Sequence, residues 1–176
     1  CLHSQPSSND GDTKMTQVLI EVPLNTFINA LDYNRGHSQA YRESLSSGSE
    51  ISLEVAEAYH EYKKDDRVLG MSQLEHKAKL SKFYREQCRL MLAYEGSTPV
   101  GGYAVLQGTL LAFHNVRKGC GTWMLDRAVV DGAERLDCFA VPRLVELYSS
   151  RGFKEVRRSK NWVEGGLDVV WMERKQ

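Results

Sequence analysis

The sequence predicts a single α/β (α+β) domain with a mixed, mostly antiparallel sheet flanked by helices and a helical insertion after the first strand. Three observations lead to this fold class. A strand pattern near the start is followed by a long helical stretch to about residue 87. Three strand patterns with short turns between them then occupy residues 90–116, as in an antiparallel meander. A helix and a short strand come next, and such a unit is right-handed and leaves its two strands parallel.

The amino-terminal part of the chain is expected to pass from a tail into a strand and then into helices. Residues 1–14 are rich in Ser, Asn, Asp and Gly, so we expect a disordered tail or a cloning remnant, with the native start at Met15. A mature lipoprotein would also begin with a cysteine, as Cys1 does. Residues 17–22 form a strand pattern that Pro23 closes. Stripes at helical spacing follow over Leu24–Leu31, Ile51–Tyr62 and Leu74–Tyr84.

The second half of the chain alternates between short apolar runs and glycine- or proline-marked breaks. Glycine favours turns and helix ends, and proline favours the first position of a helix. The expected elements are strands over 90–94, 100–106 and 108–116, a helix after Gly121, a strand over 136–140, a helix from Pro142 to Gly152, and strands over 153–158 and 168–173.

Composition limits the partners of this domain. The chain carries 23 basic and 23 acidic residues, so no net charge draws it to nucleic acid or membrane. No apolar run approaches the roughly 20 residues needed to span a bilayer. The four cysteines, at positions 1, 88, 120 and 138, form no Cys-x-x-Cys pair and no cluster at metal-ligand spacing. We therefore expect reduced thiols in a cytoplasmic protein without a metal site.

The connection after the third strand of the meander is expected to bind an anion. An apolar run ends in a basic, glycine-containing turn that passes directly into a helix. The first amides of a helix have no partners inside it, and glycine allows a phosphate to approach the backbone. The alternative is a plain strand–helix connection, since neither a P-loop nor a complete dinucleotide fingerprint is present. The candidate anion-binding residues are Asn115, Val116, Arg117, Lys118, Gly119, Cys120, Gly121 and Thr122.

A second segment, Leu147-Tyr148-Ser149-Ser150-Arg151-Gly152-Phe153, lies downstream of this turn. Together, the turn, this segment and the order of elements resemble the GNAT (GCN5-related) superfamily of acetyl-CoA-dependent N-acetyltransferases. In that family a turn of the form Arg/Gln-x-x-Gly-x-Gly/Ala holds the cofactor pyrophosphate, and a Leu-Tyr-x-x-x-Gly-Phe segment lies beside its thiol. Gly119 and Gly121 match the turn, and the downstream segment matches in full.

The resemblance is uneven along the chain. It is good over residues 88–158 and poor over the helical stretch 24–87. We expect residues 15–176 to form one domain of this kind. Val116 stands where the family has Arg or Gln, and Val141 stands where it often has asparagine. The carboxy-terminal run is similar to small GNAT proteins encoded by bacteriophages.

The resemblance implies a function. Acetyl-CoA (coenzyme A) would be the co-substrate, lying where the sheet splays between the third meander strand and residues 136–140, with its pantetheine near Asn115 and Val116. An amine acceptor, a protein or a small molecule, would attack the thioester directly. Tyr148 would then be the general acid that protonates the departing thiolate. The acceptor, the acyl chain and the oligomeric state stay open.

The base that takes the proton of the amine is less clearly marked. His114, at the end of the central strand, titrates near neutrality and is the first candidate. The alternative for His114 is a buried, hydrogen-bonded strand residue, in which case Glu95, Asp137 or a water chain would serve. Cys138 is expected to be a buried thiol, because no partner beside it lowers its pKa.

Two rival functions follow from the same residues. A catalytically weak or inactive GNAT-fold protein could bind a partner protein, and the changes at Val116 and Val141 favour this. A nucleic-acid surface could form from an aromatic and basic cluster, although zero net charge favours ordinary strand packing. The residues of that cluster are Arg157, Arg158, Lys160, Trp162 and Trp171.

Overall fold

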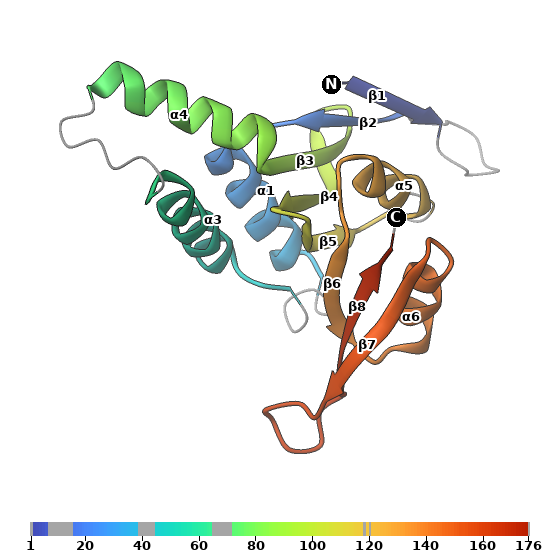
Figure 1. The fold of residues 1–176 in the computed structure, drawn as a ribbon. Coiled ribbons are helices and arrows are strands. Elements are labelled where there is room, and N and C mark those ends of the chain that lie inside the picture. Colours follow the sequence, from blue (N-terminus) through green and yellow to red (C-terminus); the bar gives the residue numbers. More distant parts are fainter. Residues whose placement is uncertain are drawn as a thin grey trace.

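The computed structural model describes residues 2–6, 16–38, 45–64, 72–117, 119 and 121–175 of the chain. Helices and strands alternate largely as the sequence predicts (Figure 1). The elements are β1 Leu2–Pro6, β2 Thr16–Glu21, α1 Leu24–Gly36, α3 Gly48–Lys64, α4 Gln73–Glu86, β3 Cys88–Glu95, β4 Thr98–Leu106, β5 Thr109–Asn115, α5 Gly121–Val130, β6 Arg135–Phe139, α6 Pro142–Ser149, β7 Phe153–Ser159 and β8 Val169–Arg174.

The strands form one mixed sheet in the order β1-β2-β3-β4-β5-β6-β8-β7. Every neighbouring pair is antiparallel except β5 and β6, which are parallel. The parallel pair is joined in register only at Thr109 and Arg135, so the two strands part beyond that point. The predicted fold class is confirmed, including the helical insertion after β2.

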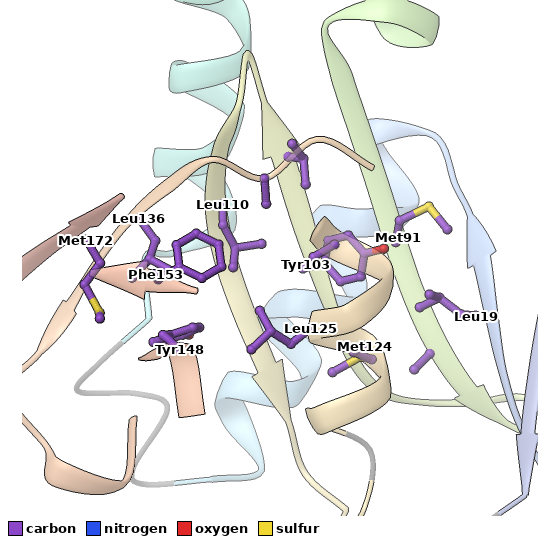
Figure 2. Packing of buried hydrophobic residues seen from close by; sticks show 14 of the residues in the cluster. Leu19, Met91, Tyr103, Leu110, Met124, Leu125, Leu136, Tyr148, Phe153 and Met172 are labelled. Atoms are coloured by element: carbon purple, nitrogen blue, oxygen red, sulfur yellow. The ribbon is translucent and has the colours of Figure 1, made fainter. Parts of the chain in front are cut away.

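Helices cover both faces of the sheet and divide the core into two halves. Helices α1, α3 and α4 pack on one face, and α5 and α6 pack on the other (Figure 1). Strand β3 is buried on both sides because successive side chains point to opposite faces. Its Leu90 and Leu92 pack with α1 and α3, whereas Met91 and Ala93 pack with α5. Figure 2 shows the second half of the core, which extends from Leu19 across α5 to Tyr148 and Phe153.

The start of the chain differs from the expectation. Residues 2–6, predicted to be part of a disordered tail, form β1 and pair antiparallel with β2. The physical reason is that β2 would otherwise present unpaired backbone groups at the sheet edge, and such an edge accepts a strand with little demand on side-chain type. Residues 7–15, with the proposed start at Met15, lie outside the described residues.

Two of the four cysteines lie in the described parts of the chain. Cys88 and Cys138 are free. Across the ranges given above, no helix is long and apolar enough to cross a membrane, and no group of His, Cys, Asp or Glu is placed to hold a metal ion.

Candidate functional site

The parting of β5 and β6 opens a cavity of about 230 Å³ in the middle of the sheet. Its wall is mostly apolar and includes Tyr148, Asp137 and Cys138. The residues that line it are Leu45, Ser46, Leu110, Leu111, Ala112, Phe113, Leu136, Asp137, Cys138, Phe139, Leu144, Tyr148, Trp162 and Val169. The cavity therefore reaches both faces of the sheet, where the sequence predicted the cofactor to lie.

Helix α6 holds Tyr148 against this cavity. Pro142 occupies the first turn of α6, where its missing N–H costs no hydrogen bond, and Gly152 leaves the helix end with a φ of 90°. Tyr148 is only 6% exposed, and its ring makes edge-on contacts with Phe113 at 6.0 Å and Phe153 at 6.1 Å between centroids. Figure 2 shows Tyr148 and Phe153 packed beside Leu110 and Leu136. The predicted general acid is thus rigidly placed on the cavity wall.

The glycine turn between β5 and α5 is braced by Asn115. The side-chain amide of Asn115 is oriented so that both its nitrogen and its oxygen find partners. Its nitrogen donates to the Arg117 carbonyl at 3.0 Å, and its oxygen accepts from the Gly121 N–H at 3.3 Å. The Val116 N–H donates to the Val100 carbonyl at 2.8 Å. The backbone N–H groups of Val116 and Gly121 therefore donate within the fold. Fewer of the predicted residues can then bind an anion through their amides.

The two glycines of the turn, Gly119 and Gly121, lie in the described part of the chain. Gly119 is exposed and has a φ of 84°, a left-handed conformation that favours glycine. Gly121 is the first residue of α5, and a Cβ added there would lie 2.7 Å from the side-chain amide of Asn115. A close backbone turn at the start of a ten-residue helix is the arrangement that binds pyrophosphate. Lys118 and Cys120 lie outside the described residues.

A chain of polar side chains fixes the start of α5. Trp123 Nε1 donates to Gln17 Oε1 at 3.3 Å, and Gln17 Nε2 donates to Glu95 Oε1 at 2.9 Å. Glu95 in turn lies 3.3 Å from Arg117 Nε. Arg117, predicted to contact phosphate, is thereby paired with Glu95, although its side chain is still 58% exposed. Glu95, one of the alternative bases, belongs to this support and does not line the cavity.

His114 is a buried, hydrogen-bonded strand residue, which was the alternative to a general base. It is 2% exposed and does not line the cavity. Its Nδ1 lies 2.8 Å from the Ala112 carbonyl, and its Nε2 lies 3.0 Å from Asn34 Nδ2 on α1. Burial lowers the pKa of His114 to about 4, although hydrogen bonds to backbone atoms of Ala112 and Gly102 act in the opposite direction. The geometry favours a structural histidine over a general base.

This histidine gives the fold a pH dependence. In the unfolded chain its pKa returns to about 6.5. The unfolded state therefore binds the proton more readily between about pH 6.5 and 4, so stability is full above this window and is lost as the pH falls through it. We expect His114 to lower the unfolding free energy by up to about 3 kcal/mol from pH 7 to pH 4.

Denaturant unfolding at several pH values measures this effect. The His114→Gln variant should show a flatter decline of unfolding free energy below pH 6.5, and His60→Gln on the exposed face of α3 serves as the matched control. An equally steep decline in His114→Gln would show that other groups carry the acid sensitivity.

The predicted nucleic-acid cluster is largely occupied by internal contacts. The Arg157 guanidinium lies 3.8 Å from the centre of the Trp171 ring, and Arg158 Nε lies 2.6 Å from Glu155 Oε1. Trp162 lines the cavity instead of joining a basic surface. These contacts favour ordinary strand packing over a nucleic-acid surface, in agreement with the zero net charge of the chain.

Comparisons with known proteins bear on the fold. No protein-family model matches the chain, and no curated protein matches it. Among solved structures, the GNAT-family acetyltransferase of Streptococcus pneumoniae is 14% identical with a TM-score of 0.53, covering 89% of this chain and 97% of that one. RimL, a ribosomal L7/L12 α-N-protein acetyltransferase in complex with coenzyme A, is 12% identical with a TM-score of 0.53 and coverages of 90% and 93%.

A third solved structure agrees with these two. The putative acetyltransferase yncA from Salmonella typhimurium, with its cofactor acetyl-CoA, is 12% identical with a TM-score of 0.51 and coverages of 90% and 93%. At these identities the likeness concerns architecture, and the chain has the GNAT fold. The similarity to bacteriophage-encoded members stays a prediction.

Proposed function

We propose that this protein is an acetyl-CoA-dependent N-acetyltransferase that moves an acetyl group directly to an amine. The observation that carries the proposal is the cavity between β5 and β6, with Tyr148 fixed on its wall. The GNAT fold supports the proposal, since two of the solved structures that share it hold coenzyme A or acetyl-CoA. Fold alone does not define an activity, and the residues around the cavity must supply the chemistry.

The residues around the cavity fit the co-substrate. Backbone amides of the turn at the amino end of α5, other than those of Val116 and Gly121, would hold its pyrophosphate. When bound, acetyl-CoA supplies a thioester whose carbonyl carbon an amine can attack. Tyr148 holds a phenolic proton at the cavity, where it can protonate the departing sulfur. Apolar side chains, among them Leu110, Leu136 and Leu144, line the same space.

Direct transfer is favoured over a covalent enzyme intermediate. Cys138 lines the cavity and is the nucleophilic side chain to consider there. Burial raises the pKa of the Cys138 thiol to about 11, and the negative charge of Asp137 acts in the same direction. A thiol with such a pKa is almost wholly protonated at neutral pH and is a poor nucleophile.

Titration calorimetry with acetyl-CoA, followed by measurement of thiol release with mixed amines, tests the proposal. We expect binding and amine-dependent release of coenzyme A. Absence of acetyl-CoA binding would overturn the proposal.

A second function, a GNAT-fold binding protein without turnover, has one observation in its favour. Val116 replaces the family's Arg or Gln, and the neighbouring Arg117 is paired with Glu95. This protein would bind coenzyme A, or nothing, and act on a partner protein. Tight acetyl-CoA binding with no thiol release from any amine would favour this second function.

A further inference from the structure

The proposed transfer needs a group that takes a proton from the attacking amine. Two of the candidate bases, His114 and Glu95, do not line the cavity, whereas Asp137 does. The other polar residues on the described part of the wall are Ser46, Cys138, Tyr148 and Trp162. Their hydroxyl, thiol and indole groups carry their own protons at neutral pH. Among the described lining residues, Asp137 therefore has the one side chain that is ready to accept a proton.

The direction of the β6 side chains places Asp137 opposite to Tyr148. In β6, Leu136 and Cys138 pack with the core on the α6 side, and Tyr148 belongs to the same core. Because side chains alternate along a strand, Asp137 points to the other face, which carries α3. Its side chain is exposed, so an acceptor can reach it. The two residues thus reach the cavity from opposite sides of the sheet.

No internal cation neutralises Asp137 in the described part of the chain. None of the ion pairs there includes this residue. Its cross-strand partner on β8 is Trp171, and the Arg157 guanidinium stacks on that ring 3.8 Å from its centre. Partial loss of hydration raises the pKa of Asp137, although a hydrogen bond with its own backbone acts in the opposite direction. A carboxylate with a raised pKa holds a proton more readily than an ordinary aspartate does.

We propose that Asp137 is the general base of the transfer and takes the proton that the amine nitrogen loses as it attacks. This inference rests on the proposed function, because it names a second catalytic residue of the same site. The nitrogen gains positive charge as its bond to the carbonyl carbon forms, so its N–H becomes acidic enough for a carboxylate to remove. The attacking nitrogen and the leaving sulfur lie on different sides of that carbon, and Asp137 and Tyr148 lie on different sides of the cavity.

The protons of the step balance between these two residues. The nitrogen–carbon bond forms, the carbon–sulfur bond breaks, and the electron pair of that bond leaves with sulfur. One proton passes from nitrogen to the Asp137 carboxylate, and one passes from the Tyr148 phenol to sulfur. Transfer of one proton from Asp137 to the phenolate through solvent restores both groups for the next turnover.

Substitution of Asp137 tests the assignment in steady-state kinetics with an amine that the thiol-release assay identifies as an acceptor. Asp137→Asn should lose about 100-fold or more in kcat/KM, as expected when a positioned base is removed. Its acetyl-CoA affinity in titration calorimetry should stay near that of the wild type. Asp126→Asn is the matched control, because Asp126 is an exposed residue of α5 that pairs with Arg151 and does not line the cavity. Wild-type turnover of Asp137→Asn would overturn the inference.

Replacement of the missing carboxylate separates a base from a structural residue. Asp137→Ala leaves space that formate can enter, so formate should raise its rate by about tenfold or more, a part of the usual contribution of a base. Chloride at the same ionic strength should have no effect, and Asp126→Ala should not respond to formate. Asp137→Glu, which keeps a carboxylate, should be faster than Asp137→Asn. Circular dichroism checks that each variant is folded. Failure of both formate and glutamate to restore any rate in folded variants would overturn the inference.

The two proposals fail in different ways. If the wild-type protein does not bind acetyl-CoA, the proposed function fails and the assignment of Asp137 fails with it. If the wild type turns over acetyl-CoA and Asp137→Asn does so equally well, the proposed function stands and the inference alone is overturned.

Discussion

The Tyr148→Phe variant should lose at least about tenfold in kcat while acetyl-CoA affinity changes little. General acid catalysis is typically worth about 100- to 10,000-fold in rate, and phenylalanine removes the donor without removing the ring. The edge-on contacts of the ring with Phe113 and Phe153 survive the change, so the cavity keeps its shape. Loss of rate without loss of affinity is expected of a group that acts only in the transition state.

Steady-state kinetics with an amine that the thiol-release assay identifies as an acceptor, and titration calorimetry with acetyl-CoA, measure the two quantities separately. Tyr33→Phe removes an equivalent hydroxyl from a half-exposed position on α1 and is the matched control. Thermal unfolding reports whether packing around α6 has changed. If Tyr148→Phe turns over at the wild-type rate, the phenol has a structural role and another group protonates the thiolate.

The sequence was sufficient for the parts of the fold that local patterns specify. The glycine turn, the proline at the start of α6 and the short turns of the meander each mark their element directly. The parallel β5–β6 pair follows from the strand–helix–strand order of β5, α5 and β6. The unpredicted strand β1 depends on an edge that exists only after β2 has joined the sheet. Backbone pairing at a sheet edge does not require a particular pattern of side chains, so the sequence of β1 does not reveal it.

The candidate site was only partly predictable, because its chemistry depends on partners far apart in the chain. His114 meets Asn34, 80 positions away, and this contact together with burial makes it a poor base. Trp162 belongs to a basic cluster in the sequence but joins the cavity wall in the fold. Asp137 was among the alternative bases, and no local signal distinguished it from Glu95.

Substitution of the turn glycines should weaken acetyl-CoA binding at least about tenfold, a loss of about 1.4 kcal/mol. In Gly121→Val, the added Cβ would lie 2.7 Å from the side-chain amide of Asn115, so the Asn115 contacts across the turn must shift. In Gly119→Val, a branched side chain would enter the approach to the first amides of α5 and would strain a φ of 84°. Both changes obstruct a phosphate that binds to backbone atoms.

Gly132→Val is the control that separates binding from backbone strain. Gly132 has a φ of 102°, similar to that of Gly119, but it follows the carboxyl end of α5 and an added Cβ would meet nothing within 4 Å. A non-glycine residue in the left-handed region costs about 1–2 kcal/mol, so Gly119→Val and Gly132→Val should lose comparable stability. Only the variants at 119 and 121 should lose affinity in titration calorimetry. Wild-type affinity in both would place the pyrophosphate elsewhere, because the turn would then tolerate side chains in the space assigned to it.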